Sequence, residues 1–460
     1  MSARGRWLTV VMVVLLVKTV FFMWLAPIMT PDSYVYDQLA TNIVNGHGYS
    51  LSREAPFRPD ATRPPLYPFL LAILYGGLGA GHISVVLLQY CLGLTSALYI
   101  YLMTRRYGKT VAYIAGVAVA SHPFLTAYES SIMPESLFTF LVVGFTFHVL
   151  RGMEKRSLLA FCLAGLYLGM SVLTRPVGFG ALVIAPVVLL RSEDRRRSLI
   201  GLIVLGFVTL LVLAPWVARN RMIFGWSGLS AISGGINLYH STGINLYHRT
   251  QELLATMDPN EVPREADHGF RRAILFAARE ARTKGMAAIW PVYTEMASSG
   301  LSDVERDQVF LRIGLSAIRE HPVAYLWGSL RRIKGVWSGY NLSMLLPGLQ
   351  GAWARPLRAN YEGGEFGIVG LKMIFQVAMP GVLIMLAIVG LVPRDNLGLF
   401  CALLAASLTI IPALLLAGDT RFRIPVEPFV VILAVRGLSR LLGGRVERLN
   451  NRECADVVAP

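Results

Sequence analysis

One acidic residue stands out because of its place in the chain. Asp32 follows a hydrophobic run at residues 7–29 and lies between Pro31 and Tyr34. A carboxylate at the point where a membrane helix meets water can accept a proton from a hydroxyl group. The position also fits a structural role, because Thr30 could cap a helix starting at Pro31 and Asp32 would offset the helix dipole. The spacing leaves both interpretations open.

A second acidic residue, Glu135, has the same ambiguity. It follows Pro134 at an expected helix start, and a long apolar run comes directly after it. Acidic residues at membrane depth usually face a cavity or a charged partner. Glu135 is therefore a second candidate for a catalytic acid.

Arginine residues gather at the expected outer ends of hydrophobic helices. They are Arg175, Arg219, Arg421 and Arg423. Arginines at such ends often only extend their charged heads out of the membrane. A planar guanidinium group also binds phosphate through two hydrogen bonds, so Arg421 and Arg423 could hold a phosphate that arrives on a lipid.

The composition indicates what kind of protein carries these residues. Of the 460 residues, 54% are hydrophobic and 15% are charged, whereas soluble domains contain about 25% charged residues. We therefore expect an all-α polytopic membrane protein. The net charge of +15 is concentrated in short loops between hydrophobic runs, which is a topology signal, and no nucleic-acid partner is expected. The four cysteines and eight histidines have no disulfide or metal-site spacing.

Hydrophobic runs of about the length needed to cross a bilayer recur along the chain. Ten spans are expected, at residues 7–29, 82–104, 110–127, 134–150, 157–174, 177–190, 198–218, 368–391, 396–417 and 424–441. The span at 177–190 is short and follows a break at Thr174-Arg175-Pro176, which could face a cavity. Residues 66–79 are apolar but also short, and we expect them to form an interfacial or re-entrant helix.

Basic residues orient these spans. Eighteen of them lie in short loops on one side, at 4–6, 105–109, 151–156, 191–197, 394 and 436–452, and six lie on the other side. The positive-inside rule places the basic side in the cytoplasm. The expected organisation is an N-terminal membrane domain (1–218) with a first external loop (30–81), an external helical domain (219–367), C-terminal membrane helices (368–441) and a cytoplasmic tail (442–460). The protein would be a multi-pass protein of the plasma (cytoplasmic) membrane.

The external domain contains two further expected helices. The first begins at Ser302, whose spacing to Glu305 is that of a capping box, and ends before Pro322. The second follows from Pro322 and carries an apolar stripe with basic neighbours. The stripe is Leu326, Leu330, Ile333 and Trp337, and the basic residues are Arg331, Arg332 and Lys334. This pattern fits a helix that lies on the membrane beside lipid phosphates, and equally a helix packed on the core of the domain.

Seven short motifs occur in a characteristic order on this topology. They are Pro31-Asp32-Ser33-Tyr34, Asn45-Gly46-His47-Gly48-Tyr49, Arg63-Pro64-Pro65-Leu66-Tyr67-Pro68, Pro134-Glu135-Ser136-Leu137, Thr174-Arg175-Pro176, Pro215-Trp216 with Arg219-Asn220, and Arg421-Phe422-Arg423-Ile424-Pro425. In these motifs, which span residues 1 to about 440, the chain resembles the C-type glycosyltransferases. The resemblance is to the group that contains protein O-mannosyltransferases and the aminoarabinose transferase of lipid A.

This resemblance implies a membrane glycosyltransferase that moves a hexosyl or pentosyl group from a polyprenyl-phosphate donor to an extracytoplasmic protein, lipid or glycan. Asp32 would be the catalytic carboxylate. The expected donor-phosphate residues are Arg63, Arg175, Arg219, Arg421 and Arg423, and the expected substrate-lining residues are Tyr34 and Tyr67. Many relatives carry two adjacent acids where this chain has Asp32-Ser33, so Asp37 or Glu135 could share the work, and the use of a divalent metal is left open.

Two other classes of protein fit the same outline. A transporter or flippase for a lipid-linked sugar would also contain many spans, a broken helix and arginines at its rim. A non-catalytic membrane assembly subunit is the second alternative, and in such a subunit Asp32 could be replaced freely.

The orientation can be tested by labelling. A cysteine placed near Asn260 should react with a membrane-impermeant thiol reagent in intact cells, because the 219–367 loop is expected outside. Reaction that occurs only after lysis would show that the assigned topology is wrong.

Overall fold

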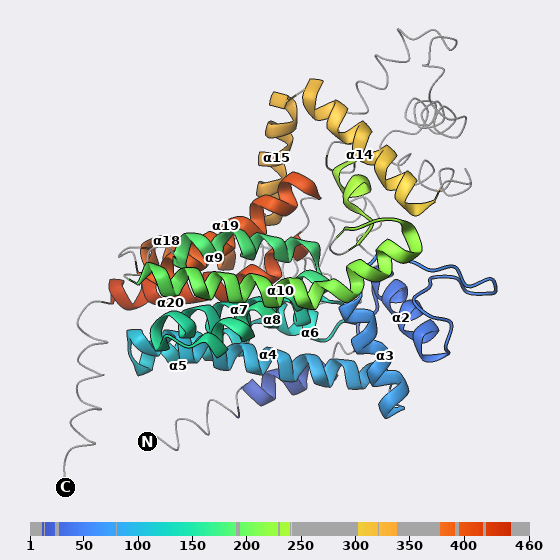
Figure 1. Ribbon diagram of the computed structural model, residues 1–460. Coiled ribbons are helices and arrows are strands. Elements are labelled where there is room, and N and C mark those ends of the chain that lie inside the picture. Colours follow the sequence, from blue (N-terminus) through green and yellow to red (C-terminus); the bar gives the residue numbers. More distant parts are fainter. Residues whose placement is uncertain are drawn as a thin grey trace, which may run out of the picture.

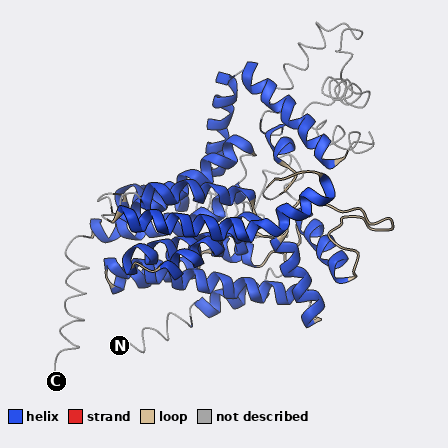
Figure 2. Ribbon diagram, in the orientation of Figure 1, coloured by secondary structure: helices blue, strands red, loops and turns tan. Residues whose placement is uncertain are grey.

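The computed structural model is helical throughout the part of the chain that it describes. The described residues are 12, 14–23, 27–79, 81–189, 194–228, 231–239, 241, 302–320, 322–337, 378–391, 395–416 and 420–442. Within them, extended backbone pairs only at two isolated bridges, Ile28 with Ser131 and Ser50 with Pro59. Figure 2 shows helices joined by loops. The expected all-α class is confirmed for these residues.

Within the described residues, most helices run side by side in a bundle (Figure 1). They are α4 (His82–Thr104), α5 (Lys109–Ala120), α6 (Pro123–Glu129), α7 (Glu135–Lys155), α8 (Leu158–Thr174), α9 (Phe179–Leu189), α10 (Arg195–Phe224), α18 (Met379–Gly390), α19 (Asn396–Leu415) and α20 (Glu427–Leu441). A short 3-10 turn, η1 (Arg105–Tyr107), continues α4.

Four helices of this bundle are long and apolar enough to cross a membrane. They are α4 with η1, α7, α10 and α19, and α5 with α6 would make a fifth span bent by 47°. Several further apolar helices are shorter, among them Val14–Met23 and α18. The expected number of ten spans therefore remains a prediction, as do the domain boundaries drawn from it.

Small residues let neighbouring helices of the bundle approach closely. A Cβ atom added at Gly390 of α18 would lie 1.9 Å from the carbonyl oxygen of Leu433, and one added at Gly437 of α20 would lie 1.9 Å from that of Leu386. Such contacts are typical of membrane helices, where backbone packing takes over part of the role that the hydrophobic effect has in water.

Charged side chains inside the bundle are paired. Lys18 and Glu129, which are 4% and 5% exposed, form an ion pair between the first helix and α6. Arg423 pairs with Glu427, and both side chains are fully buried. Buried charges are tolerated when they have partners of this kind. The sequence analysis did not single out Lys18, although it is the one charged residue within the run 7–29.

The elements that carry the candidate site lie at one end of the bundle. They are α2 (Pro31–Val44), α3 (Leu66–Leu78), the 3-10 turn η2 (Pro176–Gly178) and the 3-10 segment η7 (Thr420–Val426). As predicted, α2 starts with Thr30 as its cap and Pro31 in its first turn. The predicted break also occurs, because α8 ends at Thr174 and Arg175 is extended, with φ −149° and ψ 129°.

Two helices project beyond the bundle near this end (Figure 1). These are α14 (Asp303–Glu320) and α15 (Pro322–Trp337), which match the two helices predicted there. The Glu305 backbone N–H donates to Ser302 Oγ, and the Ser302 N–H donates to Glu305 Oε2, so the predicted capping box is confirmed. Residues 242–301 and 338–377 of the expected external domain, and the tail after residue 442, lie outside the described residues.

Candidate active site

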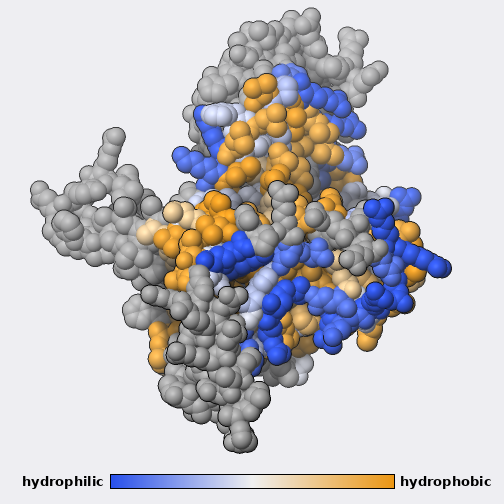
Figure 3. Space-filling view, turned by 90° about the vertical axis from the view of Figure 1, so that its left-hand side faces the viewer, coloured by the Kyte–Doolittle hydropathy of each residue, from blue (hydrophilic) through white to orange (hydrophobic). Residues whose placement is uncertain are grey.

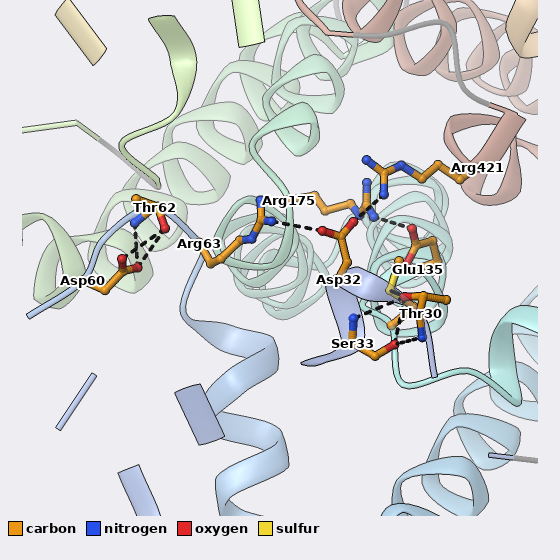
Figure 4. A network of polar contacts seen from close by, with 10 residues as sticks. Thr30, Asp32, Ser33, Asp60, Thr62, Arg63, Glu135, Arg175 and Arg421 are labelled. Atoms are coloured by element: carbon orange, nitrogen blue, oxygen red, sulfur yellow. Dashed lines mark hydrogen bonds and ion pairs between the residues drawn. The ribbon is translucent and has the colours of Figure 1, made fainter. Parts of the chain in front are cut away.

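Asp32 lies between two arginines that come from distant parts of the chain. Arg63 Nη2 donates to Asp32 Oδ1 at 3.0 Å, and Arg421 Nη1 donates to Asp32 Oδ2 at 2.7 Å. Arg63 comes from the loop before α3 and Arg421 from η7, as Figure 4 shows. The three side chains keep 31% to 36% of their surface exposed. The charges are therefore ordered and still accessible to a ligand.

The start of α2 explains why the carboxylate of Asp32 is available for these contacts. The Ser33 N–H donates to Thr30 Oγ1 at 3.2 Å, and the Thr30 N–H donates to Ser33 Oγ at 2.9 Å. Helix capping is thus performed by Thr30 and Ser33, and Asp32 is not needed for it. Ser33 is fully buried.

Glu135 and Arg175 form a buried ion pair next to this group (Figure 4). Glu135 is 1% exposed at the start of α7, and Arg175 is 15% exposed at the break after α8. A small cavity is lined by Glu135, Arg175 and Arg421, with apolar walls from α7, α19 and η7. Among the described residues, nothing hydrogen-bonds to Glu135 Oε2 or Arg175 Nε. Buried polar atoms usually have partners, so these two atoms offer contacts to a ligand or to water.

The charges of the site favour an anion. Three guanidinium groups, of Arg63, Arg175 and Arg421, stand against the two carboxylates of Asp32 and Glu135, which leaves a net positive charge. Burial raises the pKa of the Asp32 carboxyl, but the arginines lower it by more, Arg63 and Arg421 most strongly, and the resulting pKa lies below its usual value. Asp32 is therefore ionised at neutral pH and is a weak base while both arginines hold it.

Arg219 lies on α10, in the wall of a separate apolar cavity of about 600 Å³. Its guanidinium group packs over the ring of Trp216 at 4.5 Å and over that of Tyr49 at 5.4 Å. The other walls come from α3, the end of α8 and the loop before α3. Tyr49 OH donates to the carbonyl oxygen of Arg63 at 3.0 Å, so this cavity adjoins the backbone that carries Arg63.

The other predicted site residues lie apart from Asp32. Arg423 is fully buried against Glu427, with its guanidinium group 4.7 Å from the Trp337 ring centre. Tyr34 is 62% exposed, and Tyr67 is fully buried with its hydroxyl donating to Gln89. The roles predicted for these three residues stay predictions, and the geometry does not add to them.

Asp37 has partners of its own. Tyr75 OH donates to Asp37 Oδ1 at 2.9 Å, and His82 Nε2 lies 2.9 Å from the same atom. These contacts tie α2 to α3 and to the start of α4. Asp37 therefore has a structural connection that explains its presence without a role in the site.

Two aromatic residues at the site were missed by the sequence analysis. Phe422 lies beside two arginines, with its ring centre 5.8 Å from Arg175 Cζ and 5.3 Å from Arg421 Cζ. Tyr36 lies 6.0 Å from Arg63 Cζ. Tyr36 could have been found, because it stands four residues after Asp32 and shares its helix face. Phe422 was named only as part of the motif at Arg421–Pro425, and no role was predicted for it.

The acidic residues around Asp32 do not make a good metal site. Both oxygens of Asp32 accept from arginines, and Glu135 is paired with Arg175. Among the described residues, there is no group of three or more His, Cys, Asp or Glu side chains that could hold a metal ion. A divalent cation prefers several oxygen ligands without adjacent cations, and the residues around Asp32 do not offer such a set.

Known proteins resemble this chain in sequence and in fold. Residues 62–218 match the family of dolichyl-phosphate-mannose-protein mannosyltransferases. The matched segment includes Arg63, Glu135 and Arg175, three of the residues that meet at the site. No curated protein sequence matches the chain.

Solved structures provide the second comparison. The oligosaccharyltransferase AglB from Archaeoglobus fulgidus, in complex with an inhibitory peptide and a dolichol-phosphate, aligns with 98% of this chain and 52% of its own, at 16% identity and a TM-score of 0.51. The apo form of the oligosaccharyltransferase from the same organism aligns with 97% of this chain and 52% of its own, at 15% identity and a TM-score of 0.51. ArnT from Cupriavidus metallidurans, bound to undecaprenyl phosphate, aligns with 96% of this chain and 79% of its own, at 14% identity and a TM-score of 0.41, too low to carry an argument about fold.

The chain spans about half the length of the oligosaccharyltransferases whose fold it shares. At these sequence identities the likeness concerns the fold alone. Together with the match over residues 62–218, it confirms the predicted resemblance to the C-type glycosyltransferases.

The buried pair of Glu135 and Arg175 predicts a measurable coupling. Arg175→Met should destabilise the protein by about 3–5 kcal/mol, because it leaves the Glu135 carboxylate buried without a partner. The double variant Glu135→Gln/Arg175→Met should recover most of this loss in thermal unfolding measured in detergent.

A control variant comes from the exposed pair of Arg197 and Asp194, whose side chains are 58% and 38% exposed. Arg197→Ala should change the stability by less than about 1 kcal/mol. If the double variant is as unstable as Arg175→Met, the two residues are not coupled and their contact does not stabilise the site.

Proposed function

We propose that the protein transfers a sugar from a polyprenyl-phosphate donor to an extracytoplasmic acceptor, with Asp32 as the catalytic base. The observation that supports this most directly is the accessible Asp32 carboxylate held between Arg63 and Arg421. A carboxylate for the acceptor and guanidinium groups for a phosphate are the two kinds of side chain that such a transfer needs. The sequence match and the fold are consistent with that chemistry.

In this proposal the guanidinium groups bind the donor phosphate. Arg63 and Arg421 each carry donors that are already aimed at an anionic oxygen of Asp32, and their side chains are 36% and 31% exposed. Hydrogen bonds between guanidinium and phosphate are charge-assisted and can be bidentate. The same contacts would stabilise the charge that develops on the phosphate as it leaves. Arg175 adds a third positive charge nearby.

The isoprenoid chain of the donor would lie in the apolar cavity of about 600 Å³. Its lining includes Leu66 and Phe69 of α3 and Trp216 of α10. The cavity adjoins the Arg63 backbone through the Tyr49 hydroxyl, so the apolar part of the lipid would lie next to the residues assigned to its phosphate. Arg219 would face the same lipid.

Donor binding would also activate Asp32. Arg63 and Arg421 lower the pKa of the Asp32 carboxyl. A phosphate that takes over hydrogen bonds from Arg63 and Arg421 weakens these ion pairs, and the pKa of Asp32 then moves back up toward its usual value. The carboxylate becomes a stronger base only when the donor is present, which favours binding of the donor before reaction of the acceptor.

The chemical step balances as a displacement at the anomeric carbon. The acceptor hydroxyl gives its proton to an Asp32 oxygen while the acceptor oxygen bonds to the anomeric carbon. The bond from that carbon to the phosphate oxygen breaks, and its electron pair leaves with polyprenyl phosphate. Glu135 lines the small cavity, and its Oε2, which has no hydrogen-bond partner among the described residues, would accept a hydrogen bond from a hydroxyl of the bound sugar.

Asp32→Asn should abolish sugar transfer while the protein stays folded and still binds the donor. Asparagine keeps the shape of the side chain, and Thr30 and Ser33 continue to cap α2, but the amide cannot act as a base. General bases typically contribute 10²–10⁴-fold, so a turnover assay that follows release of polyprenyl phosphate should show a loss of about that size.

Asp60→Asn provides the matched control. Asp60 belongs to the same external loop and is 8% exposed, but it accepts its hydrogen bonds from Thr62 rather than from arginines, and it lies on the far side of Arg63 in Figure 4. This variant should retain turnover. Near-normal turnover of Asp32→Asn would remove Asp32 from the mechanism, and absence of polyprenyl phosphate release by the native protein would favour a transporter.

Arg421→Ala should raise the apparent KM for the donor without preventing folding. Loss of one charge-assisted phosphate contact costs on the order of 1.5–3 kcal/mol, which corresponds to roughly a 10- to 150-fold weaker interaction. Donor titration of the purified variant measures this change. Arg53→Ala, at an exposed arginine of the same external loop, should leave the apparent KM unchanged. Equal values for the native protein and Arg421→Ala would show that Arg421 only supports Asp32.

A further inference from the structure

One face of α15 fastens this helix to the membrane bundle. Tyr325 OH donates to the carbonyl oxygen of Leu414 at the end of α19. Arg332 donates to the carbonyl oxygens of Ala413 and Ser241. Val336, one turn further, is fully buried. Ser329, which is 3% exposed, lies between Tyr325 and Arg332. With it, the inner residues recur every three to four positions and define a face that packs on the protein.

The outer face of α15 is apolar and exposed. Val323, Leu326, Trp327 and Leu330 expose 78%, 57%, 59% and 56% of their surface. They stand three to four residues apart and therefore form one stripe. Of the four residues predicted to form a stripe on this helix, Leu326 and Leu330 are on the outer face, whereas Trp337 packs against Arg423. A continuous exposed stripe of this size usually marks an interaction surface.

The exposed stripe of α15 faces the same layer as the apolar sides of the bundle helices. In Figure 1, α15 stands crosswise to the bundle helices and projects beyond them. Figure 3 views the molecule from the left-hand side of Figure 1, along the bundle, and its upper, projecting part shows a largely hydrophobic surface with hydrophilic edges. The apolar surface thus faces the layer that the apolar sides of the bundle occupy. In a membrane-spanning protein that layer is the bilayer.

Two basic residues border the stripe. Arg331 and Lys334 are exposed, and the Arg331 guanidinium group lies 5.8 Å from the centre of the Trp327 ring. We propose that α15 is an interfacial helix that inserts its outer stripe into the leaflet on the side of Asp32, with Arg331 and Lys334 bound to anionic phospholipid headgroups. The apolar stripe matches the acyl region, and the two cations match the headgroup charge.

Docking of α15 on the membrane would affect the candidate site through contacts with η7. The Arg423 guanidinium group of η7 packs on Trp337 at the end of α15, and the end of α19 that precedes η7 is held by Tyr325 and Arg332. Arg421, two residues before Arg423, pairs with Asp32. This step rests on the proposed function: an anionic membrane would hold Arg421 in place and lower the apparent KM for the donor.

Bromine-labelled phospholipids test the docking step in the full-length protein. The native protein and Trp327→Phe are placed in nanodiscs made with brominated or unlabelled lipid, and the difference between the two proteins reports the emission of Trp327. We expect the Trp327 emission to be strongly quenched by brominated lipid. Quenching should be greater in nanodiscs that contain phosphatidylglycerol than in phosphatidylcholine alone.

A separate pair of substitutions tests how much the charges of Arg331 and Lys334 contribute to docking. Arg331→Ala/Lys334→Ala should reduce the docking equilibrium in phosphatidylglycerol by about fivefold for each residue removed, so that Trp327 emission in this background approaches its value in phosphatidylcholine. Arg53→Ala/Arg58→Ala removes the same charge from the exposed part of the first external loop and should have no effect. If brominated lipid does not quench the Trp327 emission, the proposal is overturned. This includes the case in which cross-linking finds a second copy of the chain on this face.

Donor titration in the same nanodiscs tests the link to the site. The apparent KM for the donor should be several-fold lower with phosphatidylglycerol, and Arg331→Ala/Lys334→Ala should lose this advantage while kcat stays unchanged. If the native protein shows no transfer at all, the proposed function fails and the quenching result still decides docking. If transfer occurs with a KM that does not depend on the lipid although Trp327 is quenched, the link through η7 is wrong.

Discussion

The ion pairs of a single carboxylate connect three distant segments of this protein. Asp32 belongs to the start of α2, Arg63 to the loop before α3 and Arg421 to η7 near the other end of the chain. Each of these charges is partly removed from water, and a lone charge in such a place would be unfavourable. Mutual pairing offsets that cost and fixes the distance between the segments. The same pairing places one carboxylate and two guanidinium groups within one small volume.

Breaks in the helices of the bundle make this arrangement possible. The break after Thr174 leaves Arg175 extended at the edge of the bundle, where its side chain reaches Glu135. η7 has a similar effect, because it separates α19 from α20 and turns Arg421 toward Asp32 while Arg423 points into the core. Two arginines that are neighbours in the sequence thereby acquire different roles. One remains accessible to a ligand and the other supports the packing of α15.

Electrostatics and shape act together in the proposed reaction. An excess of guanidinium groups attracts a phosphate, and the adjoining apolar cavity of about 600 Å³ suits a long hydrocarbon chain. A lipid phosphate combines both properties in one molecule. In the proposed reaction, the lowered pKa of Asp32 would keep the base weak until the phosphate binds. The contacts of α15 with α19 and η7 would carry the proposed docking on lipid headgroups to the site.

Much of this organisation follows from the sequence. Hydrophobic runs predict helices because spacing and composition act locally, and capping residues such as Thr30 and Ser302 mark helix starts through contacts with residues three positions away. Asp32, Glu135 and most of the arginines could be nominated because charged residues next to apolar runs need an explanation. What no local pattern contains is the pairing: that Arg421 reaches Asp32, that Arg175 reaches Glu135, and that Arg423 turns inward to Glu427. The first two pairings join residues far apart in the chain, and only the packing of the helices decides which of several equivalent charges meet.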